Sequence, residues 1–418
     1  MNITSKIVAL SSAVAFALQI ALALLMLRYF SPEEVGMFSV ISQIGFFWTT
    51  LALAQAPLRL LANHGDSVLD DAKVAWVSSM QRFVWLLSVA ALAVWWSGLS
   101  FVSALLWALL LSLCQLTWML AQSMRLRMTR AWAQVGVRVL PPLMALLVAT
   151  AAVYMQWDGP ALLSAALLGY AAGAAWLLPA LLTFWRGMFD EVSAKSDGVA
   201  LSSALQDPSQ ATTASVSGDN RSTALRMAHT LADALLATAT VVVWQRLYGA
   251  QETGWMAAPL RVMGFVPAVV HMAWAQVQLA QPQHARANPL WVGLGGFACV
   301  ALFGAGCAVA LEMGWLGEQW RGVRPYLLPL VVWQGSACLV AAFSYLPFQV
   351  SKADKYTRLC IGVSALQIFV LLAPIFMELH TSQYVHMIIF SIFSSVGLIF
   401  IFAKIKIYLH VSFALPKS

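Results

Sequence analysis

Charged residues are scarce in this sequence: Asp, Glu, Lys and Arg make up only 10% of its 418 residues, whereas 61% are hydrophobic. Soluble domains carry roughly 25% charged residues, so the composition excludes an ordinary soluble globular protein. The five cysteines show neither paired nor metal-ligand spacing, and the chain lacks a glycine-rich phosphate loop, a zinc-binding pattern and a nucleophile elbow. We therefore expect no enzyme, no bound metal and no cofactor.

Long apolar runs dominate the sequence instead. Roughly 20 helical residues cross the ~30 Å hydrocarbon core of a bilayer. Twelve runs come near that length, at about 7–27, 37–58, 76–96, 101–122, 135–155, 161–184, 225–247, 255–275, 290–311, 326–348, 359–377 and 385–403. This pattern predicts an all-α polytopic membrane protein with about twelve transmembrane helices in two six-helix bundles.

The segment between the two sets of runs is rich in Ser, Thr, Ala, Asp and Gly and holds few large apolar residues. Such a composition does not bury enough apolar surface to become ordered. We therefore predict an N-terminal six-helix bundle at 1–184, a disordered cytoplasmic linker at 185–224, a C-terminal six-helix bundle at 225–404 and a cytoplasmic tail at 405–418.

Lysine and arginine are distributed unequally between the two sides of these spans. With the N-terminus inside, seventeen fall in cytoplasmic segments, and four fall in outer loops: Arg28, Arg246, Arg321 and Arg324. Positive charge accumulates in cytoplasmic loops of membrane proteins. We therefore predict cytoplasmic N- and C-termini, and the net charge of +7 does not indicate a nucleic-acid partner.

A short internal repeat follows the first span and the seventh. The first copy reads Arg28-Tyr29-Phe30-Ser31-Pro32-Glu33-Glu34-Val35-Gly36, and the second reads Arg246-Leu247-Tyr248-Gly249-Ala250-Gln251-Glu252-Thr253-Gly254. The arginine, the second glutamate and the final glycine recur at a constant offset of 218 residues (246 minus 28). Because each half has an even number of spans, the repeat is a parallel one, which is a transporter architecture.

The first copy, extended to Tyr29-Phe30-Ser31-Pro32-Glu33-Glu34-Val35-Gly36-Met37-Phe38, resembles the polysaccharide-export families of the multidrug/oligosaccharidyl-lipid/polysaccharide (MOP) flippase superfamily. It is most similar to the O-antigen (Wzx-type) flippases, although the linker is longer than expected there. The resemblance implies alternating access by two bundles in the bacterial inner (cytoplasmic) membrane. It implies a polyprenyl-diphosphate-linked glycan as substrate, moved from the cytoplasmic to the periplasmic leaflet during lipopolysaccharide (O-antigen) biosynthesis. Membrane lipids, a glycan polymerase and chain-length proteins are the partners it implies.

Three arginines lie in or beside the apolar runs: Arg59 at the end of the second, Arg82 in the first turns of the third and Arg261 in the eighth. Charge inside a membrane is costly and usually faces a cavity or a partner, and guanidinium binds phosphate oxygens in pairs. The resembled superfamily lines its cavity with cations partly from the second and eighth spans. These arginines are therefore candidate diphosphate-binding residues; alternatively, Arg59 and Arg82 extend to the interface.

His229 and Asp233 stand four residues apart near the start of the seventh run, and so share a helix face. A buried carboxylate has a raised pKa and can exchange protons near neutral pH, and histidine titrates there without any shift, which makes the two residues candidates for ion coupling. Alternatively, they form a satisfied polar pair, or Asp233 pairs with Arg261 or Arg82. We expect His271 to be an interfacial histidine.

Competing functions remain open. A cation-coupled multidrug exporter of the same superfamily would place acidic groups in its cavity, whereas arginines outnumber acids in these spans. A membrane-embedded glycosyltransferase or polymerase would use Glu33 and Glu34 as catalytic acids, but every expected outer loop has about 15 residues or fewer, too few to shape an acceptor site. A scaffold without transport would not need internal arginines.

Overall fold

The computed structural model describes residues 3–54, 56–62, 67–128, 131–179, 181–182, 220–275, 278, 288–349, 352–377 and 382–414. These residues form helices and no strand. The predicted linker at 185–224 lies outside the described residues except for 220–224, which begin a helix. The described part of the tail at 405–418, up to residue 414, continues the last helix.

The first half of the chain contains eight α-helices and a short 3₁₀ turn within its described residues. They are α1 (Ile3–Tyr29), α2 (Pro32–Leu53), α3 (Ala56–Ala62), α4 (Val68–Trp85), α5 (Leu87–Ser97), α6 (Phe101–Arg127), α7 (Ala131–Tyr154), α8 (Ala161–Ala174) and η1 (Ala175–Leu177).

The second half begins with the longest helical element. Its described elements are α10 (Asn220–Val269), the π-helix η3 (Val270–Ala275), α12 (Pro289–Glu312), the 3₁₀ helix η4 (Glu318–Val323), α13 (Arg324–Phe343), α14 (Leu346–Gln349), α15 (Ala353–Phe376) and α16 (Gln383–Ala414).

The element α10 is two helices that fold back on each other. Gly249 has non-helical angles, φ 84° and ψ 179°, and divides it into a first arm, 220–248, and a second arm, 250–269. His229 and His271 line one cavity, although a straight helix would hold them roughly 60 Å apart. The chain therefore reverses at Gly249, where a glycine tolerates positive φ without a steric clash.

Nine described helices are long and apolar enough to cross a membrane, and the pair α4–α5, bent by 47°, raises that number to ten. The division of α10 at Gly249 adds one span, and the short apolar helix Ala161–Leu177 stands where the sixth span was predicted. The predicted fold class, an all-α polytopic membrane protein, is therefore confirmed. Large apolar side chains such as Trp85, Trp132 and Leu302 point outward, as lipid-facing positions require.

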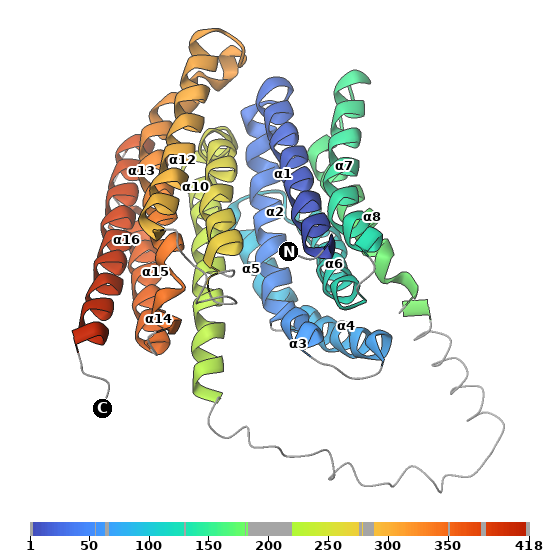
Figure 1. Cartoon of the computed structure of the whole chain (residues 1–418). Helices are drawn as coiled ribbons and strands as arrows, with labels where there is room; N and C mark the ends of the chain where they lie inside the picture. Colours follow the sequence, from blue (N-terminus) through green and yellow to red (C-terminus); the bar gives the residue numbers. More distant parts are fainter. Residues whose placement is uncertain are drawn as a thin grey trace, which may run out of the picture.

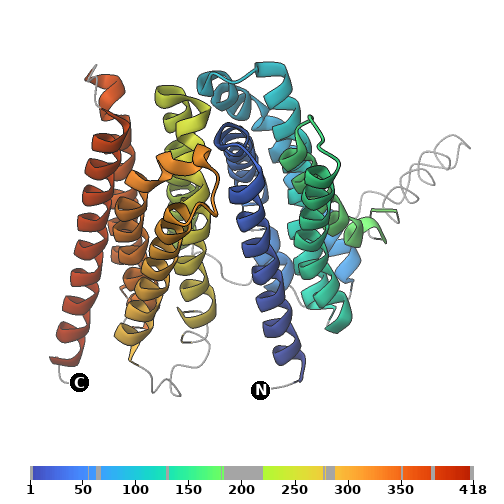
Figure 2. The ribbon, with the colours of Figure 1, turned by 90° about the horizontal axis from the view of Figure 1, so that it is seen from above.

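Helices of the two halves stand side by side. Figures 1 and 2 both show α1 to α8 on one side and α10 to α16 on the other, and Figure 1 shows α2 and α10 next to each other in the middle. The pairing of α2 with α10 is the most extensive between any two elements. This boundary between the halves positions the candidate site.

Hydrogen bonds at its first turn explain where α2 begins. Ser31 Oγ accepts from the Glu34 amide at 3.2 Å, and the Glu34 carboxylate accepts from the Ser31 amide at 2.9 Å. This capping box, with Pro32 in the first turn, satisfies amides that lack helical partners. The residues from Pro32 to Gly36, which precede the apolar run at 37–58, therefore belong to the helix, and Glu34 serves as a capping residue.

Candidate functional site

The two copies of the repeat meet across the boundary between the halves. A β-carbon added to Gly36 would lie 1.9 Å from the carbonyl oxygen of Ala250, and one added to Gly254 would lie 1.8 Å from that of Pro32. Pro32 and Ala250 differ by the same 218 residues as Gly36 and Gly254, so the contact is reciprocal. Only glycine permits this approach, because any other residue would place a carbon inside the partner's carbonyl oxygen.

Further contacts join the halves beside these glycines. The carbonyl of Phe30 accepts hydrogen bonds from Trp320 Nε1 at 3.2 Å and from Gln319 Nε2 at 3.3 Å. The guanidinium of Arg28 donates to the carbonyl of Trp315 and lies 5.7 Å from the centre of its ring. We call this end of the molecule the seam end. Here the halves are held together by close packing and hydrogen bonds.

A cavity of about 760 Å³ lies in the second half, where that half faces α2. Most of its lining comes from α10, α13 and α15, and Ser39, Gln43 and Phe46 of α2 contribute from the first half. Near His229 and His271 its wall is accessible to solvent, since 57% of the Asp233 side chain is exposed there. We call this region the mouth. The structure is therefore closed at the seam end and accessible at the mouth.

Arg261 projects from the second arm of α10 toward the first half. Its Nη2 donates to Ser42 Oγ at 2.9 Å, and its guanidinium carbon lies 4.5 Å from the centre of the Phe38 ring. Within the described part of the chain, no carboxylate forms an ion pair with it. A cation without a counter-ion inside a membrane protein favours binding of an anion.

Arg261 also lines a second cavity, of about 250 Å³, which lies among α1, α2, α6, α7 and α8. Its wall is mainly apolar and includes Phe38 and Tyr170. The guanidinium is thus shared between the large cavity and this smaller one. It stands at the junction of the two halves, because it lies on the second and contacts Ser42 and Phe38 of the first.

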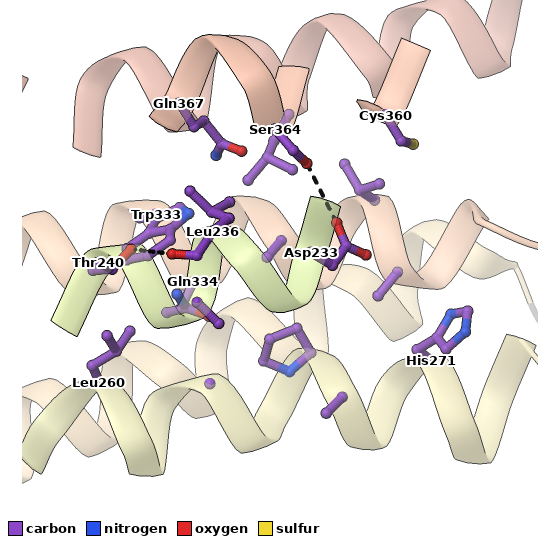
Figure 3. A pocket seen from close by; sticks show the side chains of 18 of the residues that line it. Asp233, Leu236, Thr240, Leu260, His271, Trp333, Gln334, Cys360, Ser364 and Gln367 are labelled. Carbon is purple, nitrogen blue, oxygen red and sulfur yellow. Dashed lines mark hydrogen bonds between the residues drawn. The ribbon is translucent and has the colours of Figure 1, made fainter. Parts of the chain in front are cut away.

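The predicted pair of His229 and Asp233 is present in the structure. His229 Nε2 lies 3.5 Å from Asp233 Oδ2, and Asp233 Oδ1 accepts from Ser364 Oγ of α15 at 3.3 Å. Asp233 forms no ion pair with Arg261 or Arg82. His271, expected at the interface, lines the same cavity and hydrogen-bonds Ser344 Oγ at 3.0 Å. Figure 3 shows Asp233 and His271 together on one side of the cavity.

Two of the predicted arginine positions require correction. Arg82 lies in the last turn of α4 rather than in the first turns of a span, because α4 already begins at Val68. Its Nε donates to the carbonyl of Ala52 at 2.6 Å and its Nη2 to that of Leu53 at 3.3 Å, so it caps the end of α2. It lines neither cavity.

Arg59 belongs to α3 and not to the second span, because α2 ends at Leu53 and Ala54 adopts φ 47°. A positive φ at alanine interrupts the helix, and Pro57, three residues further on, is the sequence signal of this break. The side chain of Arg59 lies outside the described atoms.

Uncharged polar residues of the site escaped the sequence analysis, which considered ionisable groups. Gln43, Gln334 and Gln367 line the large cavity, and Gln115 lines the small one. Gln334 and Gln367 are 7% and 4% exposed. The side-chain amides of these four residues have no hydrogen-bond partner among the residues that the structure describes. Their sequence signal is a glutamine within an apolar run, because an unpaired amide in a membrane is costly, as a charge is.

The sequence matches no protein-family model and no curated protein. Among solved structures, "Lipid II flippase MurJ, inward closed conformation" aligns with a TM-score of 0.61 and 11% identity, over 98% of this chain and 90% of that chain. An inward-facing multidrug resistance MATE family transporter of the MOP superfamily aligns with a TM-score of 0.49 and 11% identity over 96% of both chains. A MATE point mutant aligns with a TM-score of 0.39 and 12% identity, over 99% of this chain and 97% of that one. This multi-pass membrane protein therefore has the fold of the lipid II flippase MurJ.

Proposed function

We propose that this protein is a flippase that moves a polyprenyl-diphosphate-linked oligosaccharide from the cytoplasmic to the periplasmic leaflet. The observation that carries the proposal is Arg261, a guanidinium without a carboxylate partner among the described residues, in the wall of a cavity where the second half faces α2. Its free donors suit phosphate oxygens. The MurJ-like fold supports a flippase, and the resemblance of the repeat supports an O-antigen substrate.

Alternating access follows from the asymmetry between the two ends. The seam end is closed by the Gly36 and Gly254 contacts, and the mouth is accessible at Asp233. With the predicted orientation, the mouth faces the cytoplasm and the seam end faces the periplasm of an inner-membrane protein. The head group enters at the mouth and binds Arg261 while its lipid tail stays in the bilayer. Opening of the seam end then releases the head group on the other side.

Energy coupling is the role we propose for Asp233 and His229. Asp233 stands at the mouth and contacts both His229 on its own arm and Ser364 of α15. Loss or gain of a proton there changes the attraction between α10 and α15, two elements of the same half. Protonation of Asp233 and His229 therefore changes how α10 packs against α15 within the second half.

A second candidate is a cation-coupled multidrug exporter. Asp233 favours it, because a half-exposed carboxylate in a large cavity attracts a cationic drug. Arg261 opposes it, because an unpaired guanidinium in the same cavity repels that drug. Transport of an organic cation that Asp233→Asn abolishes and Arg261→Ala leaves intact would favour the exporter.

The experiment replaces Arg261 with Ala and measures surface glycan together with flipping of lipid-linked glycan in proteoliposomes. Both are expected to fall sharply while the protein still inserts into the membrane. Arg138→Ala is the matched control, because Arg138 lies within α7, bonds Ser12 Oγ at 2.6 Å and lines neither cavity. Normal surface glycan in cells that carry the Arg261→Ala variant would contradict the proposal. The cells must express the glycan polymerase and chain-length proteins at normal levels, so that a loss of surface glycan reports on flipping.

A further inference from the structure

The large cavity has two chemically different regions. Figure 3 shows Trp333, Gln334 and Gln367 gathered on the side of Thr240, and Asp233 and His271 on the opposite side. The first side, which we call the deep end, holds neutral amides and an indole. The ionisable side chains Asp233, His229 and His271 line the mouth.

The amides at the deep end have unused hydrogen-bonding capacity. Gln334 and Gln367 are almost fully buried, yet within the described residues neither side chain has a hydrogen-bond partner. The indole of Trp333 makes a ring contact with Phe390 at 4.9 Å between centroids and likewise has no hydrogen-bond partner there. Because these groups line the cavity and keep unused donors and acceptors, they can hydrogen-bond a polar ligand there.

The kind of ligand follows from the kind of groups. A carboxamide offers an acceptor oxygen and two donor hydrogens. A phosphate needs donors and a cationic drug needs acceptors, whereas a sugar hydroxyl needs a donor and an acceptor together. An aromatic face beside the amides covers the apolar carbon face of a sugar ring. The deep end therefore matches a neutral, hydroxyl-rich group rather than the anionic part of a substrate.

The position of Gln334 relates this region to Arg261. Its Oε1 lies 3.8 Å from the place where a β-carbon on Gly264 would stand. Gly264 is three residues after Arg261 on the same arm, so both positions lie on one helix face. A sugar attached directly to a phosphate at Arg261 would therefore lie at the deep end.

We propose that Gln334, Gln367 and Trp333 bind the sugar directly attached to the lipid phosphate and select its identity. This inference rests on the proposed function, because it assigns the deep end to the same lipid-linked substrate that Arg261 binds. The deep end is then a specificity subsite that recognises the sugar, whereas Arg261 binds the charged phosphate.

Gln334→Met and Gln367→Met test the inference, because methionine keeps the shape of glutamine and removes its amide. The probes are a polyprenyl diphosphate carrying one N-acetylhexosamine, one carrying a plain hexose, and bare polyprenyl diphosphate. Binding is measured on the full chain in lipid nanodiscs. Gln81→Met, on the exposed face of α4, is the matched control.

We expect wild-type protein to bind one sugar-bearing lipid more tightly than the bare lipid. Each cavity variant is expected to weaken that binding about tenfold, as the loss of a buried hydrogen-bond partner implies, and to leave the bare lipid unaffected. Arg261→Ala is expected to weaken all the probes. Equal losses for bare and sugar-bearing lipids in the glutamine variants would overturn the subsite while leaving the flippase proposal intact. Failure of wild-type protein to bind any probe would overturn the proposed function, and the subsite with it.

Discussion

Substitution of Gly36 by alanine is expected to open the seam end. The added β-carbon would lie 1.9 Å from the carbonyl oxygen of Ala250, whereas ordinary contact begins near 3.4 Å. Both groups belong to helix backbone, so α2 and the second arm of α10 must separate by about 1.5 Å, a displacement of the kind that overpacking forces. Overpacking costs typically about 1–3 kcal/mol. Because only the closed state suffers this cost, the ratio of open to closed seam rises roughly five- to 150-fold.

The reciprocal contact at Gly254 allows a second test of the same prediction. Gly254→Ala is expected to have the same effect, because its β-carbon would meet the carbonyl of Pro32 at 1.8 Å. The double variant is expected to shift the equilibrium by much less than the sum of the two. Once the first alanine has separated the helices, the second meets no carbonyl, and neighbouring substitutions of this kind are non-additive.

Accessibility of the cavity from the seam end is the measurement. A cysteine at Ala337, which lines the large cavity, is placed in a chain whose native cysteines have been removed. A membrane-impermeant maleimide is then added from the side that the seam end faces. The two glycine variants are expected to label faster than their parent.

Gly362→Ala is the matched control for this experiment. A β-carbon at Gly362, which is exposed on α15, would meet nothing within 4 Å. That variant is expected to gain helix stability by up to about 1 kcal/mol and to label like the parent. Labelling of the Gly36 and Gly254 variants at the parent's rate would refute the reasoning about the seam.

Four further outcomes are expected. Arg82→Met should lower the thermal stability of the purified protein by about 1–3 kcal/mol, because the carbonyls at the end of α2 lose a charged donor, yet should leave lipid binding unchanged; a selective binding defect would contradict the capping role. Asp233→Asn should make flipping independent of the proton gradient, and unchanged gradient dependence would dismiss the coupling role. Ser31→Ala should cost about 1 kcal/mol by loss of the cap on α2, read as a lower melting temperature against wild type. Protease applied to the cytoplasmic face should cleave between residues 190 and 222, and cleavage only from the periplasmic face would reverse the predicted orientation.

Hydropathy located the spans well, because a helix in lipid must satisfy its own backbone and expose apolar side chains whatever its neighbours are. The ends of α2 were harder to predict. Its first turn, Pro32 to Gly36, lies before the apolar run at 37–58, although the capping box places it in the helix. Its last turn runs into an apolar segment, so only Pro57, three residues after Ala54, indicates the break.

The candidate site was predictable only as far as charge in an apolar run reveals it. Arg261, Asp233 and His229 carry that signal, and all three line the large cavity. Arg82 carries the same signal but caps α2, because the sequence does not show which carbonyls lie within reach of a guanidinium. Gln334 and Gln367 are uncharged and stood out little from their surroundings.

The sequence by itself determined that this chain spans a membrane many times as helices, and that its two halves repeat, because length, apolarity and a constant offset are properties of a linear pattern. Only the tertiary structure decided what the repeat does. Gly36 lies against Ala250, and Gly254 against Pro32, because two helices distant in sequence pack closely enough to exclude a β-carbon. The same packing brings the amides of α13 and α15 to the cavity that Arg261 lines. Such convergence depends on relative positions in space, which no local pattern specifies.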